Sequence, residues 1–168
     1  EALYEASKAH AADPRFAALH PAAIVREQTL VEDLEFLVGE NWRDEISPVP
    51  ATAAYADRIR EIAAEDWLPG IIAHHYTRYL GDLSGGQMIA KRVKKQFGFE
   101  RAGIAFYDFT ELGELGEFKQ AYRGVLDVLG ESLDEAERER MVAEVRAAYR
   151  FNSDVFVDMK NANEARKA

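Results

Sequence analysis

A run of small residues inside a long helical pattern restricts the fold of this chain more than any other feature. Between about Pro69 and Phe97 apolar residues recur at helical spacing, yet Gly81, Gly85 and Gly86 fall in the middle. Each glycine destabilises a helix interior by roughly 1 kcal/mol relative to alanine. The backbone is therefore predicted to stay bare for a reason: a kink, close approach by a flat ligand, or both. A crossing of two helices, which also uses small residues, is the alternative.

The rest of the chain predicts an all-α fold, because helical periodicity continues almost throughout and no convincing strand pattern or repeat is present. The predicted helices cover residues 1–12, 22–38 (ending at Gly39), 50–66 (beginning at Pro50), 69–97 (ending at Gly98), 114–129 and a last helix up to about Asn161. Ser132-Leu-Asp-Glu135 has the form of a capping box for that last helix. Residues 99–110 are predicted to form a loop with short extended character. One domain covering residues 1–168 is expected.

Composition excludes several classes of function. The 168 residues suffice for one hydrophobic core. A content of 48% hydrophobic and 30% charged residues is typical of a globular protein. A net charge of −9 disfavours nucleic acid as the main partner. No apolar run approaches the roughly 20 residues of a membrane span, so no membrane anchor and no signal peptide are predicted. The absence of cysteine removes disulfides and thiolates and fits a cytoplasmic location.

The glycine run belongs to a longer motif, His74-His-Tyr-Thr-Arg-Tyr-Leu-Gly-Asp-Leu-Ser-Gly-Gly-Gln87. This motif resembles the distal-helix signature of heme oxygenases, and the resemblance extends from Glu1 to about Met159. The soluble bacterial members are the most similar. The resemblance implies the family's helical fold with a glycine-kinked distal helix. It also implies oxidative cleavage of heme to biliverdin, carbon monoxide and ferrous iron, with heme as both cofactor and substrate and with dioxygen and a reductant consumed.

The candidate catalytic residues centre on Asp82, which lies one helical turn from Arg78 at the i, i+4 spacing of an ion pair. An exposed pair of this kind normally contributes little. The family resemblance instead implies a buried network in which Asp82 and Arg78 join Tyr55, Asn152 and ordered water. In the family such a network holds a water near iron-bound dioxygen and delivers a proton to it.

A second cluster is predicted to contact the heme itself. Lys119 and Arg123 are also spaced i, i+4, and two cations on one helix face suit a dianionic ligand edge, although a solvated face has the same pattern. The resemblance implies that they bind the heme propionates. The other predicted heme contacts are Tyr76, Gly81, Ser84, Gly85, Gly86, Tyr149 and Phe156. Tyr149, Asn152 and Phe156 form one helical stripe, which is typical either of core or of a wall of the heme pocket.

The iron ligand of the family is a histidine on its first helix, which would precede Glu1. None of His10, His20, His74 or His75 matches that position. Either the sequence is a fragment or its heme chemistry is compromised. Because it starts without methionine and inside a helical pattern, we expect an N-terminal helix outside this sequence, and the metal ligand in residues 1–168 stays unknown.

The predicted 69–97 helix carries a basic patch, although the chain as a whole is acidic. The patch consists of Lys91, Arg92, Lys94 and Lys95. It is either a solvated face or a docking surface for an acidic electron donor, a ferredoxin or a reductase. Two other functions stay open: a non-catalytic heme carrier or sensor on the same fold, and a non-heme member of the wider superfamily. Asp82 and its partners favour the enzyme, because a carrier has no need of oxygen activation, and the two propionate-binding cations argue against a non-heme protein.

Overall fold

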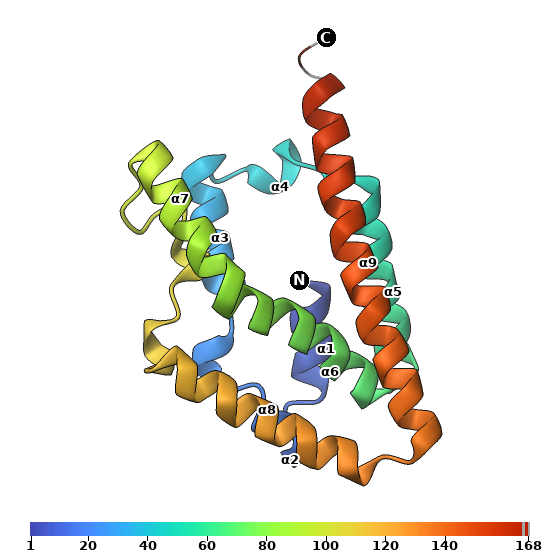
Figure 1. Cartoon of the computed structure of the whole chain (residues 1–168). Coiled ribbons are helices and arrows are strands. Elements are labelled where there is room, and N and C mark those ends of the chain that lie inside the picture. Colours follow the sequence, from blue (N-terminus) through green and yellow to red (C-terminus); the bar gives the residue numbers. More distant parts are fainter. Residues whose placement is uncertain (166, 168) are drawn as a thin grey trace. The chain divides into compact units, whose positions relative to one another are not determined.

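A computed structural model describes residues 1–165 and 167. Every regular element among these residues is a helix, which confirms the all-α prediction (Figure 1). The α-helices are α1 (Ala2–Ala9), α2 (Pro14–Ala17), α3 (Glu27–Leu37), α4 (Trp42–Glu45), α5 (Pro50–Ala64), α6 (Leu68–His75), α7 (Gln87–Phe97), α8 (Leu115–Ser132) and α9 (Glu135–Ala165). Two π-helical segments, η2 (Tyr76–Leu80) and η3 (Asp82–Gly86), lie between α6 and α7. Short 3₁₀ turns are η1 (Ala22–Ile24), η4 (Ala105–Tyr107) and η5 (Thr110–Leu112).

The residues group into two compact units. The first unit contains Glu1–His10, Ser47–Thr77 and Leu133–Ala168, and the second contains Ala11–Ile46 and Arg78–Ser132. The border between them falls within η2, so the predicted 69–97 helix contributes to both units. That helix is continuous from α6 through η2 and η3 to α7.

In the first unit α1, α5, α6 and α9 pack together, with α9 running alongside α5 (Figure 1). All eight residues of α6 are buried. A helix that is apolar on every side has to lie inside its unit, and the sequence Leu-Pro-Gly-Ile-Ile-Ala has that composition. A side chain at Gly70 would overlap the ring of Trp67 and the side chain of Ile62, so glycine is needed here for close packing.

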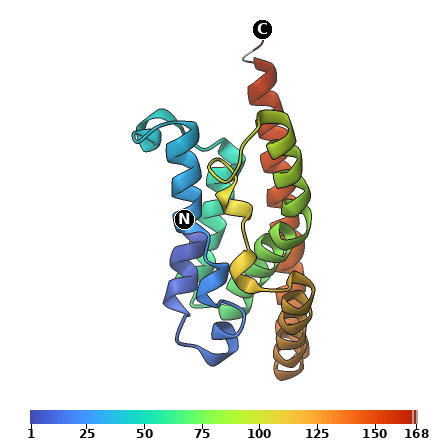
Figure 2. The same cartoon turned by 90° about the vertical axis from the view of Figure 1, so that its left-hand side faces the viewer.

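In the second unit the segment that joins α7 to α8, yellow in Figure 2, contacts α3 and η3 through its turn η4. Asp33 of α3 fixes this segment, because its carboxylate accepts hydrogen bonds from the backbone N–H of Ala105 at 2.9 Å and of Phe106 at 2.8 Å. The carboxylate thus replaces the partners that a strand or helix would give these amides.

Two details of the expected elements are wrong. The predicted 22–38 helix is broken at Val25 and Arg26, where Val25 is extended, so a 3₁₀ turn precedes the separate helix α3. The predicted capping box fails because Ser132 still belongs to α8, and its hydroxyl donates to the carbonyl of Leu129 at 2.6 Å. Asp134 caps α9 instead, accepting from the backbone N–H of Glu137 at 2.8 Å.

The helix ends predicted at two glycines agree with the sequence, whereas α1 ends before the predicted Ala12 and α8 continues beyond the predicted Leu129. Gly39 and Gly98 follow α3 and α7 with φ of 116° and 74°, values that glycine adopts without a steric penalty. The axial kink predicted at Gly81–Gly86 stays a prediction. Within the described residues no helix is long and apolar enough to span a lipid bilayer.

Candidate functional site

The glycine run lies in a stretch of π-helical backbone. The segments η2 and η3 are separated only by Gly81, and π-helical turns inside α-helices recur at functional sites. Gly81, Ser84 and Gly85 are all exposed and follow one another at i, i+3, i+4. A methyl group added at Gly81 or Gly85 would meet no atom within 4 Å. The second unit therefore presents a bare helical stripe that another molecule can approach closely.

Gly86 differs from the other two glycines. It is buried, and a side chain there would come within 2.9 Å of the ring of Tyr107. Packing against the loop thus explains why this position is glycine. Its predicted role in heme binding stays a prediction, whereas the space beside Gly81 and Gly85 suits such a role.

Asp82 and Arg78 form the predicted ion pair, with 3.6 Å between Oδ1 and Nη2. The Asp82 side chain is only 15% exposed, against 37% for Arg78. Burial raises the pKa of Asp82, and the nearby Arg78 only partly opposes this effect. The carboxyl group is consequently easier to protonate than an exposed one, which suits a group that exchanges protons.

The ring of Tyr107 lies against Gly86, and the backbone carbonyl of Tyr107 accepts from Gln87 Nε2 at 2.9 Å. Burial raises the pKa of the Tyr107 hydroxyl, and the negative charge of Asp82 adds to the increase. Tyr107 was not among the site residues predicted from the sequence. The available signal was an acidic residue, Asp33, among the apolar residues of α3, which indicates a buried carboxylate that fixes a loop.

The residues predicted to bind the propionates, Lys119 and Arg123, lie on α8, also in the second unit. Lys119 reaches the glycine-bearing stretch, where its Nζ donates to Ser84 Oγ at 3.5 Å. Arg123 is exposed, while Tyr122 between them is buried. The structure thus brings together two of the predicted contacts, Lys119 and Ser84, at the edge of the bare stripe.

In the first unit Tyr55 belongs to a buried network that was not predicted from the sequence. Its hydroxyl lies 3.3 Å from Nδ1 of His74, whose Nε2 lies 3.0 Å from Glu144 Oε1. Arg58 donates to the same carboxylate from Nε at 3.1 Å and from Nη2 at 2.7 Å. A detectable signal was Glu144 on the stripe of α9 that also carries Ala148 at i+4, since a charged residue among core positions needs partners.

The charges of this network are fixed by its surroundings. Burial by itself would raise the pKa of Glu144, but the hydrogen bonds from Arg58 hold it below its usual range. Burial lowers the pKa of His74, with Glu144 opposing the shift. The carboxylate is therefore ionised and the imidazole neutral at neutral pH.

The predicted stripe on α9 is not part of the core. Tyr149 is 54% and Phe156 is 65% exposed, and Asn152 is half-buried. Burial raises the pKa of Tyr149, as does the neighbouring hydroxyl of Tyr76. Tyr76 and Tyr149 are thus brought together in the first unit, and their exposed aromatic surface can contact a ligand.

The four predicted catalytic residues are divided between the units. Tyr55 and Asn152 lie in the first unit, and Arg78 and Asp82 in the second. The predicted four-residue network therefore stays a prediction.

The four histidines lie in different environments. His74 and His75 are fully buried in α6, and His20 stacks on Phe16 with 5.2 Å between ring centroids. His10 Nε2 lies 3.9 Å from Asp66 Oδ1. No cluster of three metal-binding side chains was found among the described residues.

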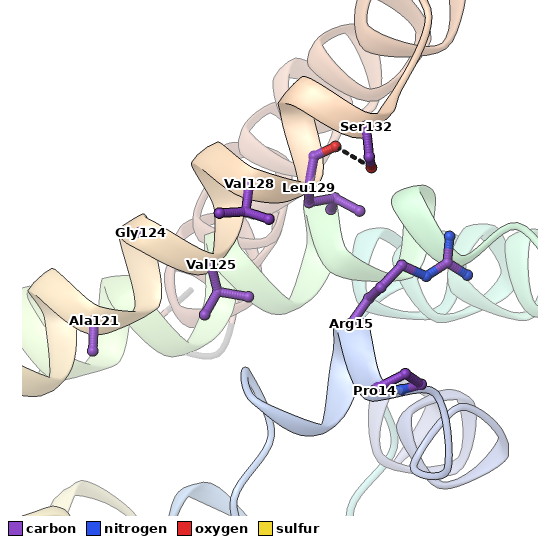
Figure 3. Close-up of a pocket in the computed structure, with 8 residues that line it drawn as sticks. All are labelled: Pro14, Arg15, Ala121, Gly124, Val125, Val128, Leu129 and Ser132. Atoms are coloured by element: carbon purple, nitrogen blue, oxygen red, sulfur yellow. Dashed lines mark hydrogen bonds between the residues drawn. The ribbon is translucent and has the colours of Figure 1, made fainter.

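The basic patch lies on α7, where Lys91, Arg92, Lys94 and Lys95 are exposed. Lys94 pairs with Glu100 at 3.1 Å. On the second unit a groove of about 540 Å³ separates α8 from α2 (Figure 3). None of the predicted site residues lines it; its lining residues are Pro14, Arg15, Ala121, Gly124, Val125, Val128, Leu129 and Ser132.

Comparison with known proteins gives a consistent result. The sequence model of the family described as "Heme oxygenase" matches residues 1–158. Heme oxygenase 1 of Nostoc sp. is 39% identical over 161 residues, which are 95% of this chain and 66% of that protein. Heme oxygenase 1 of Synechocystis sp. is 40% identical over 80% of this chain and 55% of its own length. The chain thus spans less than two thirds of these curated relatives.

Solved structures agree. Heme oxygenase-2 from Synechocystis sp., crystallised with heme and NO, superposes with a TM-score of 0.88 at 37% identity and covers 98% of this chain and 68% of that one. Heme oxygenase-1 from the same organism, in complex with heme, gives 0.86 at 35% identity over 99% of this chain and 74% of that one. With a family model matched over nearly its whole length, this chain belongs to the heme oxygenase family.

Proposed function

We propose that this protein cleaves heme oxidatively to biliverdin, carbon monoxide and ferrous iron. The observation that carries the proposal is the bare, exposed stripe of Gly81, Ser84 and Gly85 with the half-buried acid Asp82 beside it. The stripe admits a flat ligand, and the acid gives the same stretch a group that can exchange protons. The family membership and the heme-bound neighbours support the choice of heme as that ligand.

The residues present fit heme. Gly81 and Gly85 leave space for a flat macrocycle, because nothing lies within 4 Å of a methyl group added at either position. Lys119, beside Ser84, and the exposed Arg123 supply positive charge for the two propionates. Tyr76, Tyr149 and Phe156 are proposed to cover the ring, because their aromatic surface is at least partly exposed.

When bound, heme supplies the iron at which dioxygen reacts. The protein is proposed to supply the proton and to direct it to the reacting oxygen. We assign the delivery of the proton to Asp82, because burial raises the pKa of its carboxyl group toward neutral pH. Arg78 is proposed to hold the carboxylate in place. Tyr55 and Asn152 are proposed to order the water through which the proton moves, a role that rests on the family resemblance.

Gly86 is proposed to support the site indirectly, since it lets Tyr107 pack closely beside Asp82. The iron ligand is not assigned to His10, His20, His74 or His75. None of the four matches the family's ligand position.

The proposed reaction consumes electrons, which ordinary amino-acid side chains do not store, so another molecule has to supply them. We propose a ferredoxin or reductase as donor, docking on Lys91, Lys94 and Lys95 with Arg92 nearby, since all four are exposed on one helix of an acidic protein. We also propose a cytoplasmic location, where a reduced donor is at hand and where a sequence without cysteine is ordinary.

The test is turnover by the purified chain with heme, dioxygen and ascorbate, in the presence of catalase so that free peroxide does not attack heme. Parallel reactions contain imidazole, which can supply an axial nitrogen ligand. Biliverdin identified by chromatography and mass supports the enzyme. Heme bound without product in both reactions would indicate a carrier or sensor, and failure to bind heme even with imidazole would overturn the proposal.

A further inference from the structure

The buried network of the first unit has one consistent arrangement of protons. It links three helices, since Tyr55 and Arg58 lie on α5, His74 on α6 and Glu144 on α9. His74 is fully buried and Glu144 is 6% exposed. Each polar atom therefore has to be satisfied by its neighbours, and the identity of donor and acceptor can be worked out atom by atom.

The starting point is Glu144. Two hydrogen bonds from Arg58, at 3.1 and 2.7 Å, hold its carboxylate in the ionised form, which has only acceptor atoms. The nitrogen of His74 that faces it, Nε2 at 3.0 Å, must therefore carry a hydrogen. The positive charge of Arg58 already balances the buried negative charge of Glu144, whereas Glu61, the other carboxylate paired with Arg58, is exposed and screened by water. A protonated His74 would add an unmatched charge in the core, so the imidazole is neutral.

A neutral imidazole carries one ring hydrogen, so Nδ1 of His74 is an acceptor. The group beside Nδ1 is the hydroxyl of Tyr55, at 3.3 Å. Its only hydrogen points to His74, which leaves the oxygen lone pairs for all other partners. The tilted ring of His74, 5.4 Å from the Tyr55 ring, and the parallel ring of Phe151 at 5.2 Å keep the phenol in this orientation.

We infer that Arg58, Glu144 and His74 are positioning residues that make Tyr55 a hydrogen-bond acceptor, and not a proton donor, toward everything except His74. The catalytic consequence rests on the proposed function. Tyr55 can orient a water or amide by accepting its hydrogen, but it does not supply the proton that the reaction consumes. That proton has to come through Asp82 and solvent.

The direct test uses protein labelled with ¹⁵N in the histidine rings and contains no heme. Ring-nitrogen shifts distinguish a protonated from an unprotonated nitrogen, and His74→Gln assigns the signals. We expect protonated Nε2 and unprotonated Nδ1 at neutral pH. Protonated Nδ1 in the unmodified chain, in either the neutral or the charged imidazole, would overturn the inference without any variant having to fold.

Variants sharpen the test. Glu144→Gln should weaken the preference for protonated Nε2, because the amide offers donors where the carboxylate offered only acceptors. Glu61→Gln is the matched control, since Glu61 also pairs with Arg58, at 3.0 Å, but is exposed and not bonded to His74. Tyr55→Phe should shift Nδ1 toward the value of a nitrogen without a hydrogen bond and keep Nε2 protonated. An equal effect of both glutamate variants would refute the role of Glu144.

Activity separates the two proposals. If the tautomer is as expected and no variant or parent forms biliverdin, the proposed function fails while the proton assignment stands. If the parent forms biliverdin but Nδ1 is protonated, the function stands and the acceptor role of Tyr55 falls.

Discussion

At the scale of single residues, the three glycines of the 81–86 stretch do two different things. Gly81 and Gly85 are exposed with free space beside them, whereas Gly86 accommodates the ring of Tyr107. The sequence predicts that small residues are required here but treats the three alike. Only the packing of a loop that is distant in sequence shows which of the three glycines contacts protein and which leave open space.

Alanine substitutions should separate these two roles. Gly86→Ala should lower the free energy of unfolding by about 1–3 kcal/mol, because the new methyl group would lie 2.9 Å from the Tyr107 ring. Gly85→Ala, its matched control, should keep or slightly raise stability, since alanine favours a helix by roughly 1 kcal/mol, but should weaken heme binding. Urea unfolding and heme titration measure the two effects. Equal destabilisation by both variants would contradict this account.

Asp82 should show a conflict between stability and function. The folded protein raises the pKa of this carboxyl group, so its favourable contribution is present at low pH and is lost as pH rises through the folded value. Asp82→Asn should therefore raise the free energy of unfolding at neutral pH, and the gain should shrink as pH falls toward the ordinary pKa of about 3.9. Unfolding in urea over a pH series tests this. A stability loss that grows with pH would show that the pair with Arg78 outweighs burial.

At the scale of elements, hydrophobic periodicity predicted the long helices and their glycine ends, because those depend on local sequence. It failed where a tertiary contact decides the outcome. The 22–38 pattern continues across Val25 and Arg26, yet Arg26 leaves the helix to donate hydrogen bonds to the carbonyl groups of Asp108 and Ala23. The capping-box motif likewise predicts Ser132 as the cap, and only the position of the turn shows that Asp134 is the cap.

The start of α9 gives a paired prediction. Asp134→Ala should lower the free energy of unfolding by about 1 kcal/mol, because it removes the acceptor for the Glu137 N–H. Ser132→Ala should cost less, since that serine only donates back to a carbonyl of its own helix. Thermal unfolding of both variants decides between the caps. A larger loss for Ser132→Ala would restore the capping box.

At the scale of the whole molecule, the site could be predicted only in part. The motif around Asp82, and the cations Lys119 and Arg123, were identifiable because they lie at fixed spacing on single helices. The Arg58–Glu144–His74–Tyr55 network was not, because its members are up to 89 positions apart, from Tyr55 to Glu144 (144 − 55), and meet only through helix packing. The contacts of Asp33 and Tyr107 were not predicted either, because they also join segments that are distant in sequence.

The charge distribution predicts how electrons reach the protein. The net charge is −9, yet α7 exposes four basic residues, so an acidic donor should be attracted to that helix. Replacing both Lys91 and Lys95 by alanine should slow turnover with ferredoxin several-fold and reduce its salt dependence, without changing turnover with ascorbate. Lys160→Ala, an exposed lysine on α9, is the control. Equal slowing with both reductants would assign the lysines to heme binding or folding.

The most direct test of the central claim is biliverdin formation by the Asp82→Ala variant beside the parent chain, with imidazole present in both. We expect the variant to bind heme as the parent does, because Asp82 acts on protons and does not ligate iron. The variant should form little or no biliverdin and can instead use the reductant and dioxygen for peroxidase-like oxidation. Unchanged biliverdin formation with equal heme occupancy would contradict the role of Asp82 and, with it, the chemistry assigned to this site.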